Sequence, residues 1–267
     1  MDQNSLVELI TKEVLKKIES SKEGLGATAK EDAMKIAAAK INITTPRDMA
    51  KYIDHTLLKP ESRAEEFDKL CKEAIEYQFK SVCVNSSWVS YVAKKLQGTK
   101  VLVCSVVGFP LGAMTSRSKA FETREAIEHG ASEIDMVLAV GKLRAGDYKY
   151  VEEDILSVRR ATRSSTILKV ILETSMLTDE EKIIACQISK RAGADFVKTS
   201  TGFGGGGATV ADVLLMKQTV GEKIEVKASG GIRDFATALA MLEAGATRIG
   251  TGSGVAVVSG MKGSGGY

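Results

Sequence analysis

Residues 195–204 read Asp-Phe-Val-Lys-Thr-Ser-Thr-Gly-Phe-Gly, and three more glycines follow to Gly207. The small and apolar residues before Lys198 predict a buried strand, and the hydroxyl residues and glycines after it predict a loop that can approach a ligand closely. Lys198 therefore stands where a core strand opens into a loop. Most lysines are solvated surface residues, but a lysine with a lowered pKa is a nucleophile that forms a Schiff base with a carbonyl.

Two other lysines have the same setting as Lys198. Lys169 lies 29 residues before it and Lys227 lies 29 residues after it, each in a similar apolar segment. Such spacing is typical of a repeated strand-and-helix unit that places each lysine at the same position in its strand. It favours a chemical role for Lys198 over a surface position.

From Tyr52 onward the chain alternates predicted strands with predicted helices. We expect strands at 52–58, 79–84, 100–107, 132–138, 166–172, 194–200, 224–229 and 247–251. We expect helices between them at 63–77, 86–96, 116–129, 147–163, 178–192, 210–220 and 234–244. Eight such units in roughly 210 residues match a parallel sheet closed into a (β/α)8 TIM barrel, with an open doubly wound sheet as the alternative. The order helix, Gly-Ala, strand recurs at 130–131, 193–194 and 245–246 and favours closure.

The composition fits one domain with an N-terminal helical extension. The chain has 267 residues, 44% of them hydrophobic, which is enough for one sizeable core. We expect an amphipathic helix and linker at 1–26, a barrel domain with leading helices at 27–258, and a flexible C-terminal tail at 259–267.

The same composition argues against several classes of protein. A net charge of +3 with both signs interspersed is no profile for binding nucleic acid, and no apolar run reaches membrane-spanning length. The four cysteines form no Cys-x-x-Cys pair and there are only two histidines, so we expect no metal site. The N-terminus lacks a secretory signal, and buried free thiols are typical of the cytoplasm.

Polar residues gather where the predicted strands end, which is where a barrel of this kind carries its chemistry. Asp135, between Ile134 and Met136, is expensive to bury unless it is paired, and the three lysines supply partners. The pairing could be a structural salt bridge, but converging charges inside a barrel cost desolvation energy, which favours a proton shuttle beside a Schiff-base lysine. Lys227 would disfavour the protonation of Lys198, and from physics alone either lysine could be the nucleophile.

Glycine-rich segments follow the last three predicted strands, at 202–207, 229–233 and 250–254. Glycine lets backbone N–H groups approach an anion, and the helix after each loop adds its positive end. Three such loops at one rim predict a phosphate site. The last loop lacks the full spacing of a dinucleotide-binding fingerprint.

Together these motifs resemble the deoxyribose-phosphate aldolases. The matching segments are 52–58, 107–112, 133–137, 196–203 and 226–233, in order within 52–258. The resemblance implies a class I aldolase that reversibly cleaves 2-deoxy-D-ribose 5-phosphate into D-glyceraldehyde 3-phosphate and acetaldehyde in deoxyribonucleotide catabolism. It implies no metal or organic cofactor, and a dimer or tetramer of identical chains.

The resemblance also implies roles for individual residues. Lys198 would form the Schiff base, while Asp135 and Lys227 would relay protons and Lys169 would stand beside them. The residues that line the substrate or bind its phosphate would be Asp54, Thr56, Cys83, Gly204, Gly230, Gly231, Arg233, Gly252 and Ser253. Tyr267, the last residue, matches a terminal tyrosine that assists proton transfer in some relatives, with a disordered chain end as the alternative.

The segment 4–19 lies outside that resemblance. Leu6, Ile10 and Val14 fall on one helical face, and a polar, glycine-bearing linker follows. The pattern resembles the encapsulation peptides that direct enzymes into bacterial microcompartments by binding a shell protein. Packing on the barrel or within an oligomer is the alternative.

Two other functions fit part of the pattern. Another phosphate-binding barrel, such as a transaldolase or a cofactor synthase, would share the loops, but a transaldolase would not release acetaldehyde. A non-catalytic scaffold would keep the barrel only to carry the N-terminal helix. The complete set of Asp135, Lys198 and Lys227 argues against a scaffold.

Overall fold

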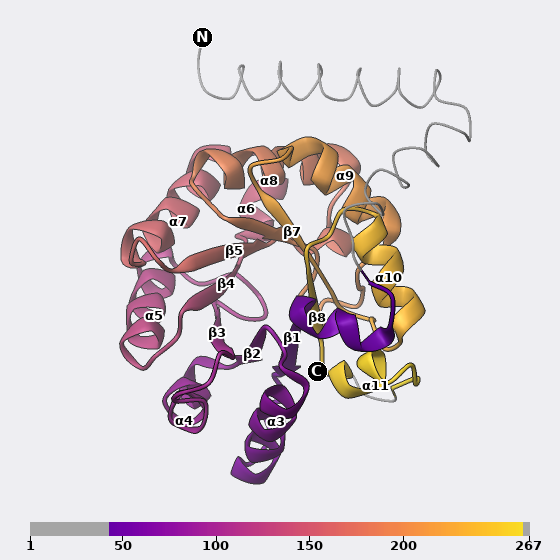
Figure 1. Ribbon diagram of the computed structural model, residues 1–267. Helices are drawn as coiled ribbons and strands as arrows, with labels where there is room; N and C mark the ends of the chain where they lie inside the picture. Colours follow the sequence, from indigo (N-terminus) through magenta and orange to yellow (C-terminus); the bar gives the residue numbers. More distant parts are fainter. Residues whose placement is uncertain (1–42, 264–267) are drawn as a thin grey trace, which may run out of the picture.

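Eight parallel strands close into a barrel in the order β1 to β8, with β8 hydrogen-bonded to β1 (Figure 1). The computed structural model describes residues 43–263. The strands are β1 (Ile53–Leu57), β2 (Ser81–Val84), β3 (Leu102–Val107), β4 (Glu133–Val137), β5 (Ile167–Ile171), β6 (Phe196–Lys198), β7 (Glu225–Ser229) and β8 (Arg248–Thr251). Each lies within the range predicted for it. The prediction of a closed (β/α)8 barrel is confirmed, and the open sheet is wrong.

Helices connect the strands and surround the barrel. Those that the sequence predicted are α3 (Ala64–Tyr77), α4 (Val89–Lys95), α5 (Ser116–Glu128), α7 (Tyr148–Ala161), α8 (Asp179–Arg191), α9 (Val210–Val220) and α10 (Phe235–Glu243). Shorter helices that were not predicted as separate elements are η1 (Pro46–Tyr52), η2 (Ser86–Trp88), α6 (Val140–Arg144), η3 (Thr174–Met176) and α11 (Gly254–Val258). Segments this short do not contain enough turns to show a helical period in the sequence.

Glycine ends three of the barrel helices, at the positions of the Gly-Ala pairs. Gly130, Gly193 and Gly245 have φ angles of 114°, 79° and 106°. The amide of the following alanine then donates to a carbonyl in the last turn of the helix, as from Ala131 to Ala126 at 2.9 Å. This closure turns the chain directly from each helix into the next strand.

Alternate residues of the strands face two different environments. Ile134, Leu168 and Val197 are fully buried and share one apolar cluster with residues of the surrounding helices. Their neighbours Asp135 and Lys169 point to the other face of the sheet, which is the interior of the barrel. Branched apolar side chains fill the interior of most barrels of this type. Here the interior holds charged side chains.

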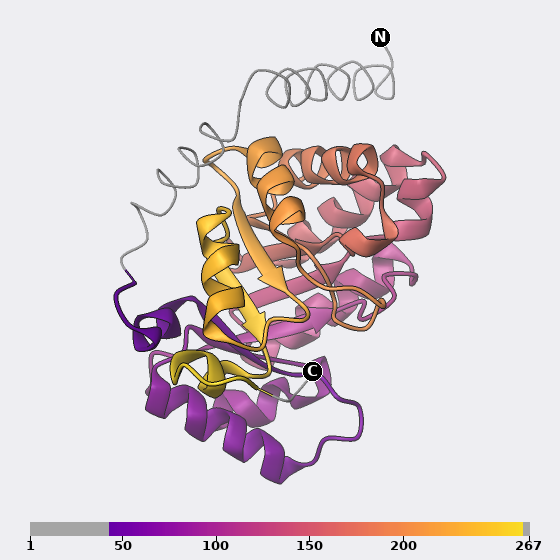
Figure 2. The ribbon, with the colours of Figure 1, turned by 90° about the vertical axis from the view of Figure 1, so that its right-hand side faces the viewer.

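The first described residues pack beside the last helix. Figure 2 shows η1 next to α11, and the two elements are in contact. Arg47 of η1 donates from Nη2 to the carbonyl oxygen of Glu76 at 2.8 Å, which fixes this part of the chain to α3. The predicted amphipathic segment 4–19 lies outside the described residues. Within 43–263, no helix combines the length and the apolar character needed to cross a membrane.

A buried ion pair joins two outer helices to the end of β4. Lys119 of α5 and Asp154 of α7 are fully buried, and their Nζ and Oδ2 atoms are 2.5 Å apart. The same Nζ donates to the carbonyl oxygen of Val137, the last residue of β4, at 2.9 Å. Burial lowers the pKa of Lys119, and Asp154 opposes that shift.

Breaking this pair should destabilise the barrel. The variant K119M leaves Asp154 as a buried, unpaired charge, so we expect it to lose about 3–5 kcal/mol of unfolding free energy. The double variant K119M/D154L removes both charges and should recover most of that loss. Urea unfolding followed by circular dichroism measures both, and equal destabilisation of the single and double variants would contradict the prediction.

Candidate active site

A single carboxylate lies at the centre of the barrel interior. Asp135 of β4 accepts a hydrogen bond at Oδ1 from Lys169 Nζ at 2.7 Å. At Oδ2 it accepts hydrogen bonds from Lys198 and Lys227, at 2.9 and 2.7 Å. The strand register explains this convergence, because Asp135 is paired with Lys169 across β4 and β5, and Lys198 with Lys227 across β6 and β7. The structure thus brings together the four charged residues that the sequence singled out on β4 to β7.

A second set of ion pairs adjoins this carboxylate. Lys227 Nζ lies 2.5 Å from Asp54 Oδ2 of β1. Lys169 Nζ lies 2.6 Å from Glu133 Oε2. Arg248 of β8 connects the two, with its Nη1 atom 2.8 Å from both Asp54 Oδ1 and Glu133 Oε2. The charges of β1, β4, β5, β6, β7 and β8 therefore form one continuous network.

The network keeps its groups ionised. Burial raises the pKa of Asp135, but the three lysines outweigh burial and hold that pKa well below its usual value. Burial lowers the pKa of Lys227, and the carboxylates of Asp135 and Asp54 reverse this shift, so that the pKa lies well above its usual value. The pKa of Lys169 is raised in the same way, against burial and mainly by Asp135. These groups therefore stay paired at neutral pH.

Three members of the network were not predicted. Glu133 and Arg248 are the first residues of the buried strands β4 and β8, and Glu133 stands two residues before Asp135, on the same face of β4. The two-residue alternation of the strand, which places Asp135 on the interior face of β4, therefore places Glu133 on that face as well. Ser81 donates from its hydroxyl to Asp54 Oδ1 at 2.6 Å. No signal in the sequence distinguishes this serine from the others.

The predicted substrate-lining residues Asp54, Thr56 and Cys83 are buried on β1 and β2. Thr56 and Cys83 are partners in the register of these strands, and the Thr56 hydroxyl donates to the carbonyl oxygen of Asp54 at 2.8 Å. Cys83 is in turn paired with Cys104 of β3, whose Sγ donates to Asp135 Oδ1 at 3.1 Å. All three predicted positions therefore adjoin the charge network.

The loops after β6, β7 and β8 lie side by side at the rim of the barrel. The amide of Ala208 donates to the carbonyl oxygen of Gly230 at 3.0 Å, which joins the first loop to the second. The Thr251 hydroxyl donates to the carbonyl oxygen of Ile232 at 2.7 Å, which joins the second to the third. The three glycine-rich segments are thus held together, as a common anion site would require.

Close approaches explain the glycines of these loops. A Cβ atom on Gly207 would lie 2.5 Å from the carbonyl oxygen of Gly230, and a Cβ atom on Gly204 would lie 2.6 Å from Cδ of Glu173. Gly230 and Gly231 have φ angles of 89° and 78°, which favour glycine. Larger residues at these positions would push the loops apart.

The remaining predicted phosphate-binding residues lie in the loops after β7 and β8. Arg233 and Gly252 are exposed, and Ser253 is buried. The amide of Ser253 donates to the Thr251 hydroxyl at 2.9 Å, and the amide of Gly263 donates to the carbonyl oxygen of Arg233 at 2.8 Å. The last described segment of the chain therefore reaches this rim. Tyr267 lies outside the described residues.

Glu173 is a further residue that the sequence did not single out. It follows β5 with a φ angle of 57° and is 2% exposed. Its carboxylate accepts hydrogen bonds from the Thr201 hydroxyl and, at 3.3 Å, from the Thr201 amide. Glu173 thereby ties the loop after β6 to the end of β5.

Known proteins resemble this chain over the whole barrel. Residues 48–260 match the model of the DeoC/LacD family aldolases. The chain belongs to this family. A deoxyribose-phosphate aldolase of Brevibacillus brevis is 60% identical over 218 residues, which are 82% of this chain and 98% of that protein. One of Streptococcus uberis is 59% identical over 217 residues, 81% of this chain and 98% of that protein.

A solved structure in the aldolase family shows the same architecture. The deoxyribose phosphate aldolase of Aeropyrum pernix, described as having a unique tetrameric structure, is 32% identical with a TM-score of 0.79. The match covers 86% of this chain and 96% of that protein. The barrel of this chain is therefore the barrel of the aldolase family.

The lowered pKa of Asp54 predicts how stability depends on pH. Burial raises this pKa, but Arg248 and Lys227 outweigh burial and bring it below the ordinary value of 3.8. The contribution of Asp54 to stability is therefore fully present above the unfolded-state pKa and is lost as pH falls through the folded-state pKa. The stability difference between the wild type and D54N should shrink in acid, by at most about 1.4 kcal/mol per pH unit. Urea unfolding from about pH 6 to about pH 2 tests this, and a constant difference would contradict it.

Proposed function

We propose that the protein is a class I aldolase that reversibly cleaves 2-deoxy-D-ribose 5-phosphate into D-glyceraldehyde 3-phosphate and acetaldehyde, in the catabolism of deoxyribonucleotides. The observation that carries this proposal is Lys198, which ends β6 with its Nζ atom 2.9 Å from Asp135 inside the barrel of an aldolase family. Relatives at 59% and 60% identity are named deoxyribose-phosphate aldolase. The lysine itself supplies the electron sink, so the chemistry requires neither a metal nor an organic cofactor.

Lys198 is the nucleophile in this proposal. Within residues 43–263, Lys169 and Lys227 each form ion pairs with two carboxylates. Lys198 forms an ion pair with Asp135 alone in the same part of the chain. Lys198 can leave its ion pair for a substrate carbonyl with the loss of one contact, whereas Lys169 or Lys227 would each lose two.

The reaction begins when Lys198 Nζ attacks the C1 aldehyde of the open-chain sugar phosphate, and loss of water gives an iminium ion. The iminium accepts the electron pair of the C2–C3 bond as the proton of the C3 hydroxyl is removed. Asp135, through a water molecule, takes this proton and returns one to C2 of the enamine, and Lys227 takes part in the relay through their shared hydrogen bond. Hydrolysis then releases acetaldehyde and restores Lys198.

The substrate phosphate binds at the joined loops after β6, β7 and β8 in this proposal. Backbone N–H groups in glycine loops and the positive ends of helices are suited to an anion. The residues assigned to the phosphate are Gly204, Gly230, Gly231, Gly252 and Ser253, with Arg233 beside them. Asp54, Thr56 and Cys83 line the rest of the substrate pocket, and Lys169 belongs to the catalytic residues around Asp135.

A trapping experiment tests the nucleophile and separates the candidate functions. Incubation with acetaldehyde and reduction with borohydride should leave an ethyl group on Lys198, located by mass spectrometry of the digested protein. The variant K198R keeps the positive charge. It should form no adduct, and its turnover should fall at least about 1,000-fold. An adduct on Lys227 would exchange the two lysine roles within the same class of enzyme.

The other outcomes point away from the proposed reaction. Folded protein without a specific adduct would favour a non-catalytic scaffold. Transfer of a dihydroxyacetone unit to an acceptor aldehyde, without release of acetaldehyde, would identify a transaldolase.

Three further predictions from the sequence belong to this proposal. The enzyme works in the cytoplasm as a homo-oligomer, in line with the tetrameric relative of Aeropyrum pernix. Tyr267 assists proton transfer at the active site. Residues 4–19 direct the enzyme into a bacterial microcompartment by binding a shell protein, a role that the amphipathic pattern supports.

Deleting residues 1–24 should leave aldolase activity intact and abolish co-purification with the shell. The double variant L6E/I10E places charges on the apolar face and should have the same effect. Its matched control, K12Q/K16Q, alters the polar face of the same segment and should still co-purify. Co-purification of the deleted protein would contradict targeting by this segment.

A further inference from the structure

Cys83 of β2 and Cys104 of β3 form a buried pair of thiols beside the charge network. They are partners in the parallel register, so their side chains point to the same face of the sheet. The two Sγ atoms and a carboxylate oxygen of Asp135 all lie within 4.8 Å of one another. Both cysteines are 0% exposed. The proposed aldolase reaction uses neither thiol as a reacting group.

The strand geometry suits a covalent bond between these two sulfur atoms. Neighbouring strands lie about 4.8 Å apart, and the Cα atoms of a disulfide are usually about 4.4–6.8 Å apart. Cysteines that face each other in register can therefore be joined by rotation of their side chains. A divalent cation fits the same place poorly, because three lysines already occupy the oxygens of Asp135 and would repel it.

We propose that Cys83 and Cys104 are a redox-sensitive pair, joined by a disulfide when the protein meets hydrogen peroxide and inactive in that form. The Cys83 thiolate attacks one peroxide oxygen, the O–O bond breaks, and the departing hydroxide takes up a proton to give water. The Cys104 sulfur then attacks the Cys83 sulfenic acid, the S–S bond forms as the S–O bond breaks, and a second water leaves. Two thiols are oxidised while one peroxide is reduced to two waters.

The surroundings assign different roles to the two thiols. The contact with the Cys104 side chain lowers the pKa of the Cys83 thiol, and this outweighs burial, with a further contribution from Lys227. Burial raises the pKa of Cys104 well above its usual value. Since the thiolate is the nucleophile, Cys83 reacts with peroxide and Cys104 resolves the intermediate.

The disulfide would disturb the proposed catalytic centre directly. Cys104 Sγ donates to Asp135 Oδ1 at 3.1 Å and accepts from Lys169 Nζ at 3.4 Å in the reduced protein. Turning this sulfur toward Cys83 removes its hydrogen bond to the central carboxylate. It also changes the wall of the pocket at Cys83. A reductant that restores both thiols should restore both contacts.

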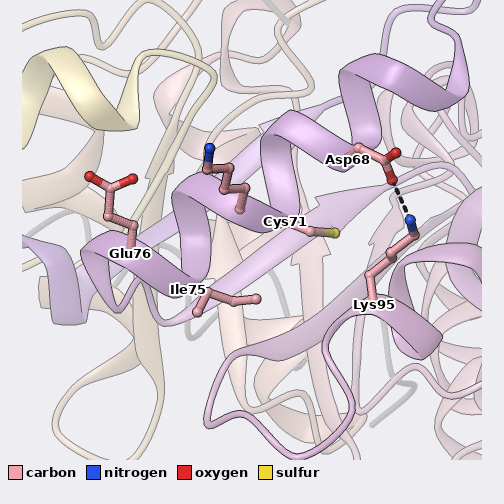
Figure 3. A pocket seen from close by; sticks show the side chains of 6 residues that line it. Asp68, Cys71, Ile75, Glu76 and Lys95 are labelled. Carbon is pink, nitrogen blue, oxygen red and sulfur yellow. Dashed lines mark ion pairs between the residues drawn. The ribbon is translucent and has the colours of Figure 1, made fainter.

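The other two cysteines provide matched controls. Cys71 of α3 lies in a cleft of about 380 Å³ between α3 and α4 (Figure 3), and burial raises its pKa to about 11. Cys186 of α8 is fully buried, and burial raises its pKa as well. Neither residue lies on a strand of the barrel, so neither should contribute to the switch.

The first test measures the bond without relying on catalysis. The protein is treated with hydrogen peroxide, its remaining thiols are alkylated in denaturant, and it is digested with trypsin without a reductant. We expect the peptides 81–94 and 101–117 to be joined, with the loss of two hydrogen atoms, and to separate after reduction by dithiothreitol. This readout does not depend on the substrate, so it can fail or succeed whatever the outcome for the proposed function.

The second test measures the consequence of the bond. Aldolase activity should fall at least about ten-fold on oxidation and return with dithiothreitol. C104A should form no cross-link and lose the reversible inactivation, measured against its own untreated rate, whereas C71A/C186A should respond as the wild type does. Separate thiols or sulfonic acids at Cys83 and Cys104, full activity of the cross-linked protein, or a loss of the response in C71A/C186A would each overturn the proposal.

Discussion

The shared carboxylate of Asp135 is the interaction on which the interior of the barrel depends. A carboxylate in a buried strand is unfavourable unless cations pair with it, and three adjacent strands each contribute one lysine to do so. The three lysines are themselves buried, and the burial of their charges would be unfavourable without Asp135. The interior of β4 to β7 therefore holds together as a unit, in which the removal of one charge leaves the others unpaired.

Such a network is a poor source of stability, because desolvation offsets most of the attraction between buried ions. The apolar layer between the strands and the helices must therefore supply the stability of the fold. Ile134, Leu168 and Val197 belong to this layer, while their neighbours in the same strands face the charges. The two-residue period of the strands separates the functions of the two faces, with stability outside and chemistry inside.

This period also explains what could be predicted from the sequence. The eight strands, the closed barrel and the meeting of Asp135 with its lysines follow from spacing that is visible in the chain. Glu133 was missed although it lies inside the predicted strand and on the same face as Asp135, because its partner Arg248 is 115 residues further along the chain. No local pattern links the two residues. The role of Glu173 depends on a contact with Thr201, and a contact between distant residues leaves no local pattern.

The charges of the barrel interior act on two kinds of nucleophile. In the proposed reaction the nucleophile is Lys198, which forms an ion pair with Asp135 alone within residues 43–263. Nearby cations also favour an ionised thiol, and Lys227 contributes in this way to the lowered pKa of Cys83. The lysines gathered around Asp135 therefore also act on a neighbouring cysteine. The proposed sensitivity of Cys83 to peroxide rests first on its contact with Cys104 and second on the positive charge of Lys227.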